Sequence, residues 1–193
     1  MKINDVEIIV IKGSVIEQDV DVIVNAAKTS LRGGGGIDGA IHRAAGLNMI
    51  AELKTKAPEG KPTAQPVMTH GYNLKQPYVI HVAGPIYKGG NNNEALLLEA
   101  AYRNSLKLAS ENNLKSIGFC SISTGLYSYP LEDAAWRAIK TAVDFVNNNP
   151  TSSIKKIVFS MYKESEFLIF TQTLKEKEIN LEKLNSQKEN KNE

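Results

Sequence analysis

The chain has 193 residues, which suits one domain with a sizeable core. Its 23 basic and 21 acidic residues give a formal charge of +2, which argues against DNA, RNA or an anionic membrane as the partner. The single cysteine excludes an intramolecular disulfide framework, and the N-terminus lacks the apolar core of a signal peptide. We therefore expect a soluble, cytoplasmic protein that is monomeric and has no membrane segment.

The first half of the chain alternates short apolar runs with segments of helical periodicity. Strands are predicted at residues 7–11 and 20–24, and four consecutive glycines follow the second strand. The helix predicted after these glycines has a core-facing stripe with i, i+3, i+4 and i+7 spacing, formed by Ile37, Ala40, Ile41, Ala44 and Ala45. A proline-rich loop covers residues 58–66, and strands are predicted at 67–70 and 78–82.

The second half repeats the pattern of a strand, a loop of small residues and a helix. Three consecutive asparagines introduce a long helix, and the strand predicted at 116–121 runs into a small-residue loop at 123–130. The next helix covers residues 131–146. A last strand at 156–160 precedes a helix that begins near Glu164.

A change in composition divides the chain near residue 175. We predict a folded domain over residues 1–175, where strands and helices alternate. Residues 176–193 are rich in lysine and glutamate and bury too little apolar surface to order themselves, so we expect a charged tail, either disordered or a frayed helix. A partner helix is the alternative for the apolar residues at roughly heptad spacing, which are Phe167, Phe170, Leu174, Leu181 and Leu184.

Strands that alternate with helices predict an α/β sandwich whose mostly parallel sheet is covered by helices on both faces. In such sheets a ligand binds beyond the carboxyl ends of the strands. Two glycine-containing loops, 28–36 and 123–130, follow strand ends and precede helices, whose free amides attract anions. We therefore expect one phosphorylated ligand to bind between these two loops.

Several other functions are weighed against this one. Residues 34–39 match G-x-G-x-x-G, but the acidic residue that a nicotinamide-binding fold needs after its second strand is missing. The phosphate-loop motif and the G-x-S-x-G motif are absent. The histidines show no metal-binding spacing, so we expect neither a metal nor a cofactor. His70 and His81 are expected to be structural, and Cys120 to be a buried small hydrophobe.

Five motifs in order along the chain give it a resemblance to a known family. They lie at residues 22–27, 33–46, 71–74, 78–85 and 123–127. The chain resembles an ADP-ribose-binding macrodomain of the MacroD-like group. This resemblance implies a three-layer α/β/α sandwich with a mixed, mostly parallel sheet. It also implies ADP-ribose or an ADP-ribosylated protein as the partner, and a hydrolase that removes mono-ADP-ribose from acidic side chains or deacetylates O-acetyl-ADP-ribose. The alternative is binding without efficient turnover.

The resemblance also assigns roles to individual residues. Backbone amides of the two glycine-containing loops are implied to hold the diphosphate. Tyr127 is implied to lie against the distal ribose and Tyr162 to stack on adenine, with packing in the core as the competing role of Tyr162. The residues implied to contact the ligand are Ser14, Val15, Asn25, Ala26, Gly33, Gly34, Gly35, Gly36, Ile37, Ser123, Thr124, Gly125, Leu126, Tyr127 and Tyr162.

Asp38 matches the catalytic carboxylate of the family, which orients and deprotonates the water that attacks the anomeric carbon. A charge at a helix N-terminus is the alternative role of Asp38, and His42, one turn further on, is either functional or structural. Two positions depart from the family pattern. Ser14 stands where the family has an aspartate that receives the adenine amino group. Lys28 stands where the family has an asparagine important for turnover, and it is expected to pair with the diphosphate or with Asp38. Both departures favour binding over hydrolysis.

Overall fold

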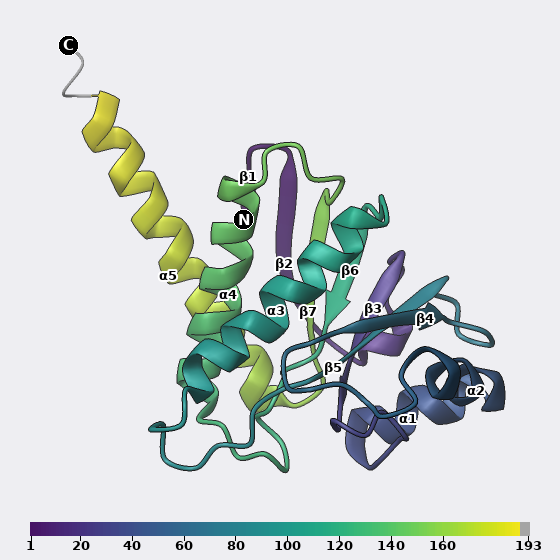
Figure 1. The fold of residues 1–193 in the computed structure, drawn as a ribbon. Coiled ribbons are helices and arrows are strands. Elements are labelled where there is room, and N and C mark those ends of the chain that lie inside the picture. The colour runs from purple at the N-terminus through teal and green to yellow at the C-terminus, as the bar shows by residue number, and fades with distance from the viewer. Residues whose placement is uncertain (190–193) are drawn as a thin grey trace.

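A seven-stranded mixed sheet forms the centre of the structure, a computed structural model that describes residues 1–189 (Figure 1). Its strands are β1 (Lys2–Ile3), β2 (Val6–Lys12), β3 (Val22–Ala27), β4 (Val67–His70), β5 (Tyr78–Ala83), β6 (Ser116–Phe119) and β7 (Lys156–Met161). They lie in the order β1-β2-β7-β6-β3-β5-β4. The five central strands run parallel, and the two edge strands pair antiparallel with their neighbours.

Helices cover both faces of this sheet. They are η1 (Val15–Glu17, a 3₁₀ helix), α1 (Gly36–Ala45), α2 (Leu47–Lys56), α3 (Glu94–Glu111), α4 (Leu131–Asn148) and α5 (Glu164–Glu189). Figure 1 shows α1 and α2 on one side of the sheet and α3, α4 and α5 on the other. The first three residues of β3 are fully buried between the two layers, which explains their continuous apolar sequence. The predicted three-layer α/β/α sandwich with a mixed, mostly parallel sheet is confirmed.

The core on the α3–α5 side contains four buried aromatic rings from different elements, Tyr102, Phe119, Phe159 and Phe170. Neighbouring rings in this group have their centroids 5.1–6.2 Å apart, a range in which aromatic pairs attract one another. The Tyr102 hydroxyl accepts a hydrogen bond from the Ile122 amide at 3.0 Å. The core therefore supports the start of the loop that follows β6.

Some observed elements differ from the predicted ones. β6 ends at Phe119 because the chain then leaves the sheet for a turn, in which the hydroxyls of Ser121 and Thr124 lie 2.6 Å apart. β1 and α2 were not predicted. Only Gly46 separates α2 from α1, and its φ of 87° lets the chain change direction within one residue.

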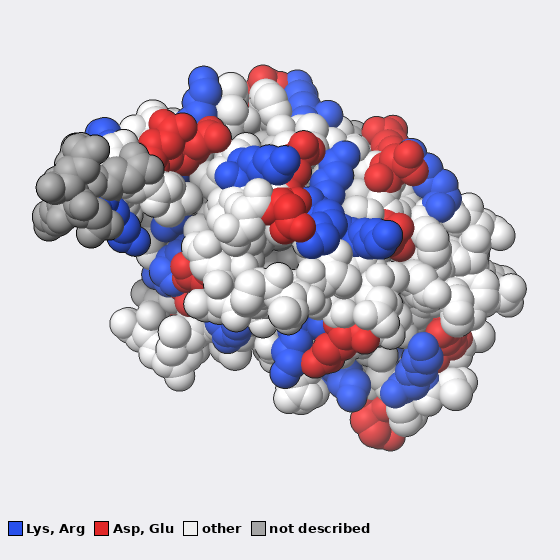
Figure 2. Space-filling model, turned by 90° about the horizontal axis from the view of Figure 1, so that it is seen from above, with Lys and Arg blue, Asp and Glu red and all other residues white. Residues whose placement is uncertain are grey.

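Of the two forms expected for the tail, the structure has the helix as far as Glu189. Leu181 packs against the core, and the N-terminal ammonium lies 3.9 Å from the Glu178 carboxylate. The last four residues of the predicted tail, 190–193, lie outside the described residues. Figure 2 shows acidic and basic side chains interspersed on one face of the molecule. No helix within residues 1–189 is long and apolar enough to cross a membrane.

Candidate functional site

A cavity of about 710 Å³ opens at the carboxyl ends of the central strands, a volume typical of a site for a small organic ligand. It lies between the loop after β3 and the loop after β6, as the topology of the sheet predicts. Most of the predicted site residues line it, namely Ser14, Val15, Ala26, Lys28, Gly35, Gly36, Ile37, Asp38, Ser123, Gly125, Leu126, Tyr127 and Tyr162.

Five predicted residues do not line this cavity, and they are Asn25, Gly33, Gly34, Thr124 and His42. Asn25 is fully buried under Asp38. Gly33 lies beside the His42 ring, since a Cβ on Gly33 would be 3.8 Å from it. Thr124 hydrogen-bonds within its own loop. Of these five residues, Asn25 and His42 lie against Asp38, which lines the cavity.

The glycine loop brings bare backbone to the start of α1. Gly36 begins the helix with a φ of 57°, a left-handed conformation that few other residues adopt. The residue before it, Gly35, has no side chain that could cap the helix, which leaves the first amides of α1 available to an anion. A Cβ on Gly39 would lie 2.5 Å from the Gly34 carbonyl oxygen, so only glycine allows α1 to approach the loop this closely.

The loop after β6 forms the opposite wall of the cavity. It is held by backbone hydrogen bonds, from the Tyr129 amide to the Ser123 carbonyl at 2.9 Å and from the Ser128 amide to the Gly125 carbonyl at 3.0 Å. The amide of Tyr87 donates to the Tyr127 carbonyl at 2.9 Å and so ties this loop to the segment after β5. The loop is thus a fixed part of the site.

Asp38 is a buried carboxylate whose two oxygens have different surroundings. Its Oδ1 accepts a hydrogen bond from Asn25 Nδ2 at 2.8 Å and lies 3.3 Å from His42 Nε2. Its Oδ2 has no hydrogen-bond partner among the described residues. Burial opposes ionisation, but His42 and Asn25 outweigh this effect and hold the pKa of Asp38 below its ordinary value. Asp38 is therefore an ionised carboxylate that lines the cavity, and its Oδ2 is buried without a hydrogen-bond partner among the described residues.

Lys28 is exposed and lines the cavity, but it does not pair with Asp38 in the described part of the chain: no carboxylate there lies within 4.0 Å of its ammonium group. Lys28 and Asp38 instead flank Gly34, since a Cβ on Gly34 would lie 3.1 Å from Lys28 Cε and 3.0 Å from Asp38 Oδ2. Of the two expected partners of Lys28, the carboxylate is excluded in this structure, and a bound anion remains.

The far end of the cavity is formed by β7 and the start of α5. Tyr162 is 77% exposed there, so the competing role in core packing is wrong. Lys163 and Glu166 also line this end and were missed from the sequence, although they follow a strand end as the other site residues do.

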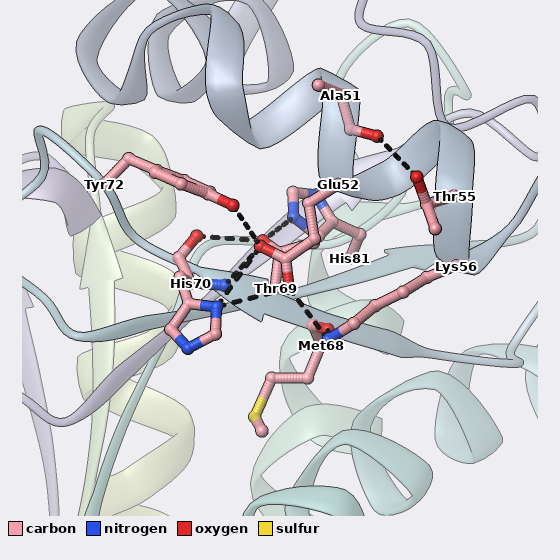
Figure 3. A network of polar contacts seen from close by, with 9 residues as sticks. All are labelled: Ala51, Glu52, Thr55, Lys56, Met68, Thr69, His70, Tyr72 and His81. Atoms are coloured by element: carbon pink, nitrogen blue, oxygen red, sulfur yellow. Dashed lines mark hydrogen bonds and ion pairs between the residues drawn. The ribbon is translucent and has the colours of Figure 1, made fainter.

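Further wall residues that the sequence did not single out for the site are Ile16, Ala27, Ala40, Gly84, Cys120, Ser121 and Ser160. Burial raises the pKa of the Cys120 thiol to about 12, which confirms its prediction as a small buried hydrophobe. His81 is buried and hydrogen-bonded, as a structural histidine should be. His70 is exposed and lies 3.3 Å from a Glu52 oxygen (Figure 3). No group of three or more His, Cys, Asp or Glu side chains within residues 1–189 could hold a metal ion.

Comparison with known proteins shows what this chain resembles. A family model described as Macro domain matches residues 24–138. A macro domain-containing protein of Caldanaerobacter subterraneus is 48% identical over 86% of this chain and 94% of its own. An O-acetyl-ADP-ribose deacetylase of Cronobacter turicensis is 44% identical over 86% and 94% of the two chains. A solved mutant macrodomain of Oceanobacillus iheyensis with ADPR has a TM-score of 0.84 and 35% identity, covering 91% of this chain and 95% of its own.

Proposed function

The chain belongs to the macrodomain family, and on this basis we propose that it binds ADP-ribose and hydrolyses the ester bond of ADP-ribosylated acidic side chains, of O-acetyl-ADP-ribose, or of both. One observation carries the proposal. A buried, ionised carboxylate, Asp38, lines a cavity between two loops, and its Oδ2 has no hydrogen-bond partner among the described residues. The similar proteins named as a deacetylase and as a macrodomain with ADPR support the ligand class.

The diphosphate of ADP-ribose fits between the two loops. Uncapped amides at the start of α1 and the backbone of residues 123–127 approach it from opposite sides, where a helix N-terminus favours negative charge. The ammonium of Lys28 adds a positive charge at the same wall. Tyr162 presents an exposed ring for adenine at one end, and Tyr127 lies against the distal ribose at the other.

Hydrolysis of the glycosyl ester uses Asp38 as the base. Its Oδ2 accepts a hydrogen bond from a water molecule and removes a proton as the water oxygen bonds to the anomeric carbon. The bond from this carbon to the carboxylate of the modified side chain breaks, and that carboxylate leaves with the bonding electron pair. Asn25 and His42 keep the Asp38 carboxylate ionised and fixed before the reaction.

A second candidate function is binding of ADP-ribose without efficient turnover. It is favoured by Lys28, whose flexible side chain lies beside Gly34, the residue that Asp38 Oδ2 also flanks. A cation here strengthens binding of the diphosphate and competes with the ordering of a water molecule at Asp38. We assign the catalytic role to Asp38, with Lys28 and His42 as the residues that modulate it.

Two assays on the wild-type protein separate these functions. Isothermal calorimetry with ADP-ribose measures binding, and release of ADP-ribose from a glutamate-modified protein measures turnover. Acetate release from O-acetyl-ADP-ribose tests the second ester. Binding with turnover supports the hydrolase, and binding alone supports the binding module. Absence of ADP-ribose binding would contradict both.

The proposal extends to the setting in which the protein acts. A single cysteine that is buried as a thiol is typical of a reducing compartment, so we assign the protein to the cytoplasm, where it acts as a monomer on ADP-ribosylated proteins. All of the site residues fall within residues 1–175, the predicted macrodomain. We therefore assign the charged tail no part in binding ADP-ribose.

A further inference from the structure

Three polar side chains form a buried row across the sheet beneath Asp38. Asn25 on β3, His81 on β5 and Thr69 on β4 are at most 1% exposed. The parallel register pairs Asn25 with His81. On β4, Val67 is the residue that pairs with His81, and Thr69 lies two residues further along that strand. Two residues earlier on β3 and β5, the same face carries apolar side chains. Buried polar groups are retained where they have partners and a role, so this row requires an explanation.

The hydrogen bonds along the row run in one direction. The Thr69 hydroxyl donates to the His70 carbonyl oxygen at 3.0 Å, so its oxygen is left to accept from His81 Nε2 at 2.9 Å (Figure 3). With the proton on Nε2, His81 Nδ1 accepts from Asn25 Nδ2 at 3.1 Å. The other hydrogen of the same amide reaches Asp38 Oδ1 at 2.8 Å. In this arrangement His81 carries its hydrogen on Nε2, and the Asn25 amide nitrogen donates to both His81 Nδ1 and Asp38 Oδ1.

His81 stays neutral in this row. Burial lowers the pKa of His81 to about 3, far below neutral pH. A neutral imidazole that does not face the cavity has no proton to exchange with the ligand. His81 can therefore affect the site only through its tautomer, that is, through which ring nitrogen carries the hydrogen.

We propose that Thr69 and His81 are positioning residues for hydrolysis, because they hold the Asn25 amide with its N–H on Asp38 Oδ1 and leave Asp38 Oδ2 free for the water. This inference rests on the proposed hydrolase function. With the other tautomer, an N–H of His81 would face the N–H of Asn25. The amide would then turn its oxygen toward Asp38, where it repels the carboxylate and raises its pKa.

The replacement Thr69→Val tests this directly, with Thr69→Ser as its matched control. Valine has nearly the same shape as threonine but cannot accept from His81 Nε2, whereas serine keeps the hydroxyl. His42 and Lys28, the other groups beside Asp38, are unchanged in both variants.

Three readouts are expected for Thr69→Val. In two-bond ¹H–¹⁵N NMR spectra, wild type and Thr69→Ser show the Nε2–H tautomer of His81, and Thr69→Val shows Nδ1–H or a mixture. In Thr69→Val, the acidic limb of the pH profile of kcat shifts to higher pH by roughly one to two units. This shift corresponds to the loss of one hydrogen bond to a charged group. The affinity for ADP-ribose changes less than about threefold, because Thr69 and His81 do not touch the cavity.

An Nδ1–H tautomer in the wild-type protein would overturn the proposal, and this measurement needs no variant to fold. So would a Thr69→Val protein with the wild-type pH profile. If the wild type binds ADP-ribose without turnover, the hydrolase function fails separately. Titration of the Asp38 carboxyl ¹³C signal in wild type and Thr69→Val then still tests the positioning roles of Thr69 and His81. These roles require a higher pKa of Asp38 in the variant than in the wild type.

Discussion

Replacing Gly39 with alanine should displace the glycine loop from α1. A Cβ at position 39 would lie 2.5 Å from the Gly34 carbonyl oxygen, and the loop must move by roughly half an ångström to reach even 3.0 Å. Overpacking of this kind costs about 1–3 kcal/mol. Alanine in a helix is more favourable than glycine by about 0.5–1 kcal/mol. The midpoints of these two ranges differ by roughly 1 kcal/mol, so we expect the free energy of unfolding to fall by about 1 kcal/mol.

Differential scanning calorimetry measures this effect as a fall in Tm of roughly 2–4 °C for a domain of this size. Calorimetric titration of the same variant with ADP-ribose should show weaker binding, because the amides at the start of α1 move with the loop. These two results together report the contact between Gly39 and the Gly34 carbonyl.

Gly35→Ala is the matched control, since it adds the same methyl group in the glycine loop, four residues before Gly39. A Cβ there meets no atom of the described residues within 4 Å, and the φ of −92° suits any residue, so the free energy of unfolding should stay within about 0.5 kcal/mol of wild type, or Tm within about 2 °C. Because Gly35 lines the cavity, ADP-ribose binding should still weaken. If Gly39→Ala melts at or above the wild-type temperature and binds ADP-ribose normally, the argument from close approach is refuted.

Three further predictions concern other parts of the protein. Lys28→Asn should raise the rate of ADP-ribose release roughly tenfold. Lys28→Ala, measured beside it, separates the effect of losing the ammonium from that of gaining an amide. Equal rates in the wild type and both variants would contradict a role for Lys28. Tyr162→Ala should raise the Kd for ADP-ribose by roughly 5- to 150-fold, which corresponds to the free energy of stacking one base on an aromatic ring. Tm should be unchanged because the Tyr162 side chain is 77% exposed. A lower Tm would instead indicate a packing role. Although burial opposes its ionisation, Glu94 accepts hydrogen bonds from the Lys88, Asn92 and Gly90 amides, which hold its pKa at about 2, below the ordinary 4.5. Its stabilising contribution is therefore complete above pH 4.5 and is lost as the pH falls toward 2, so Glu94→Gln should lower Tm at pH 7 and flatten the acid dependence; an unchanged acid profile contradicts this.

Local patterns in the sequence were sufficient for most of the fold. The apolar run at the start of β3 and the periodic stripe of α1 depend on neighbouring residues, so they could be recognised along the chain. α2 was missed because only Gly46 separates it from α1, and the two helices have one continuous pattern in the sequence. β6 ends where the chain enters a turn in which the Ser121 and Thr124 hydroxyls lie 2.6 Å apart, and this turn interrupts the apolar run of the strand.

The cavity wall was predicted where a loop carries a recognisable motif and missed where it does not. Lys163 and Glu166 reach the cavity because β7 lies between β2 and β6 in the sheet, and its pairing with β2 joins residues about 150 positions apart. The row formed by Asn25, His81 and Thr69 has the same origin, since the register of three strands brings these side chains together. Pairings of this kind depend on tertiary structure and leave no local pattern in the sequence.

The replacement Asp38→Asn tests the central claim most directly when binding and turnover are measured on one preparation. Asparagine keeps the size of the side chain but cannot act as a base at neutral pH. If Asp38 activates the water, release of ADP-ribose from a glutamate-modified protein should slow by about 10²- to 10⁴-fold. The Kd for ADP-ribose from calorimetry should change by less than about fivefold. Turnover at the wild-type rate with intact binding would contradict the account.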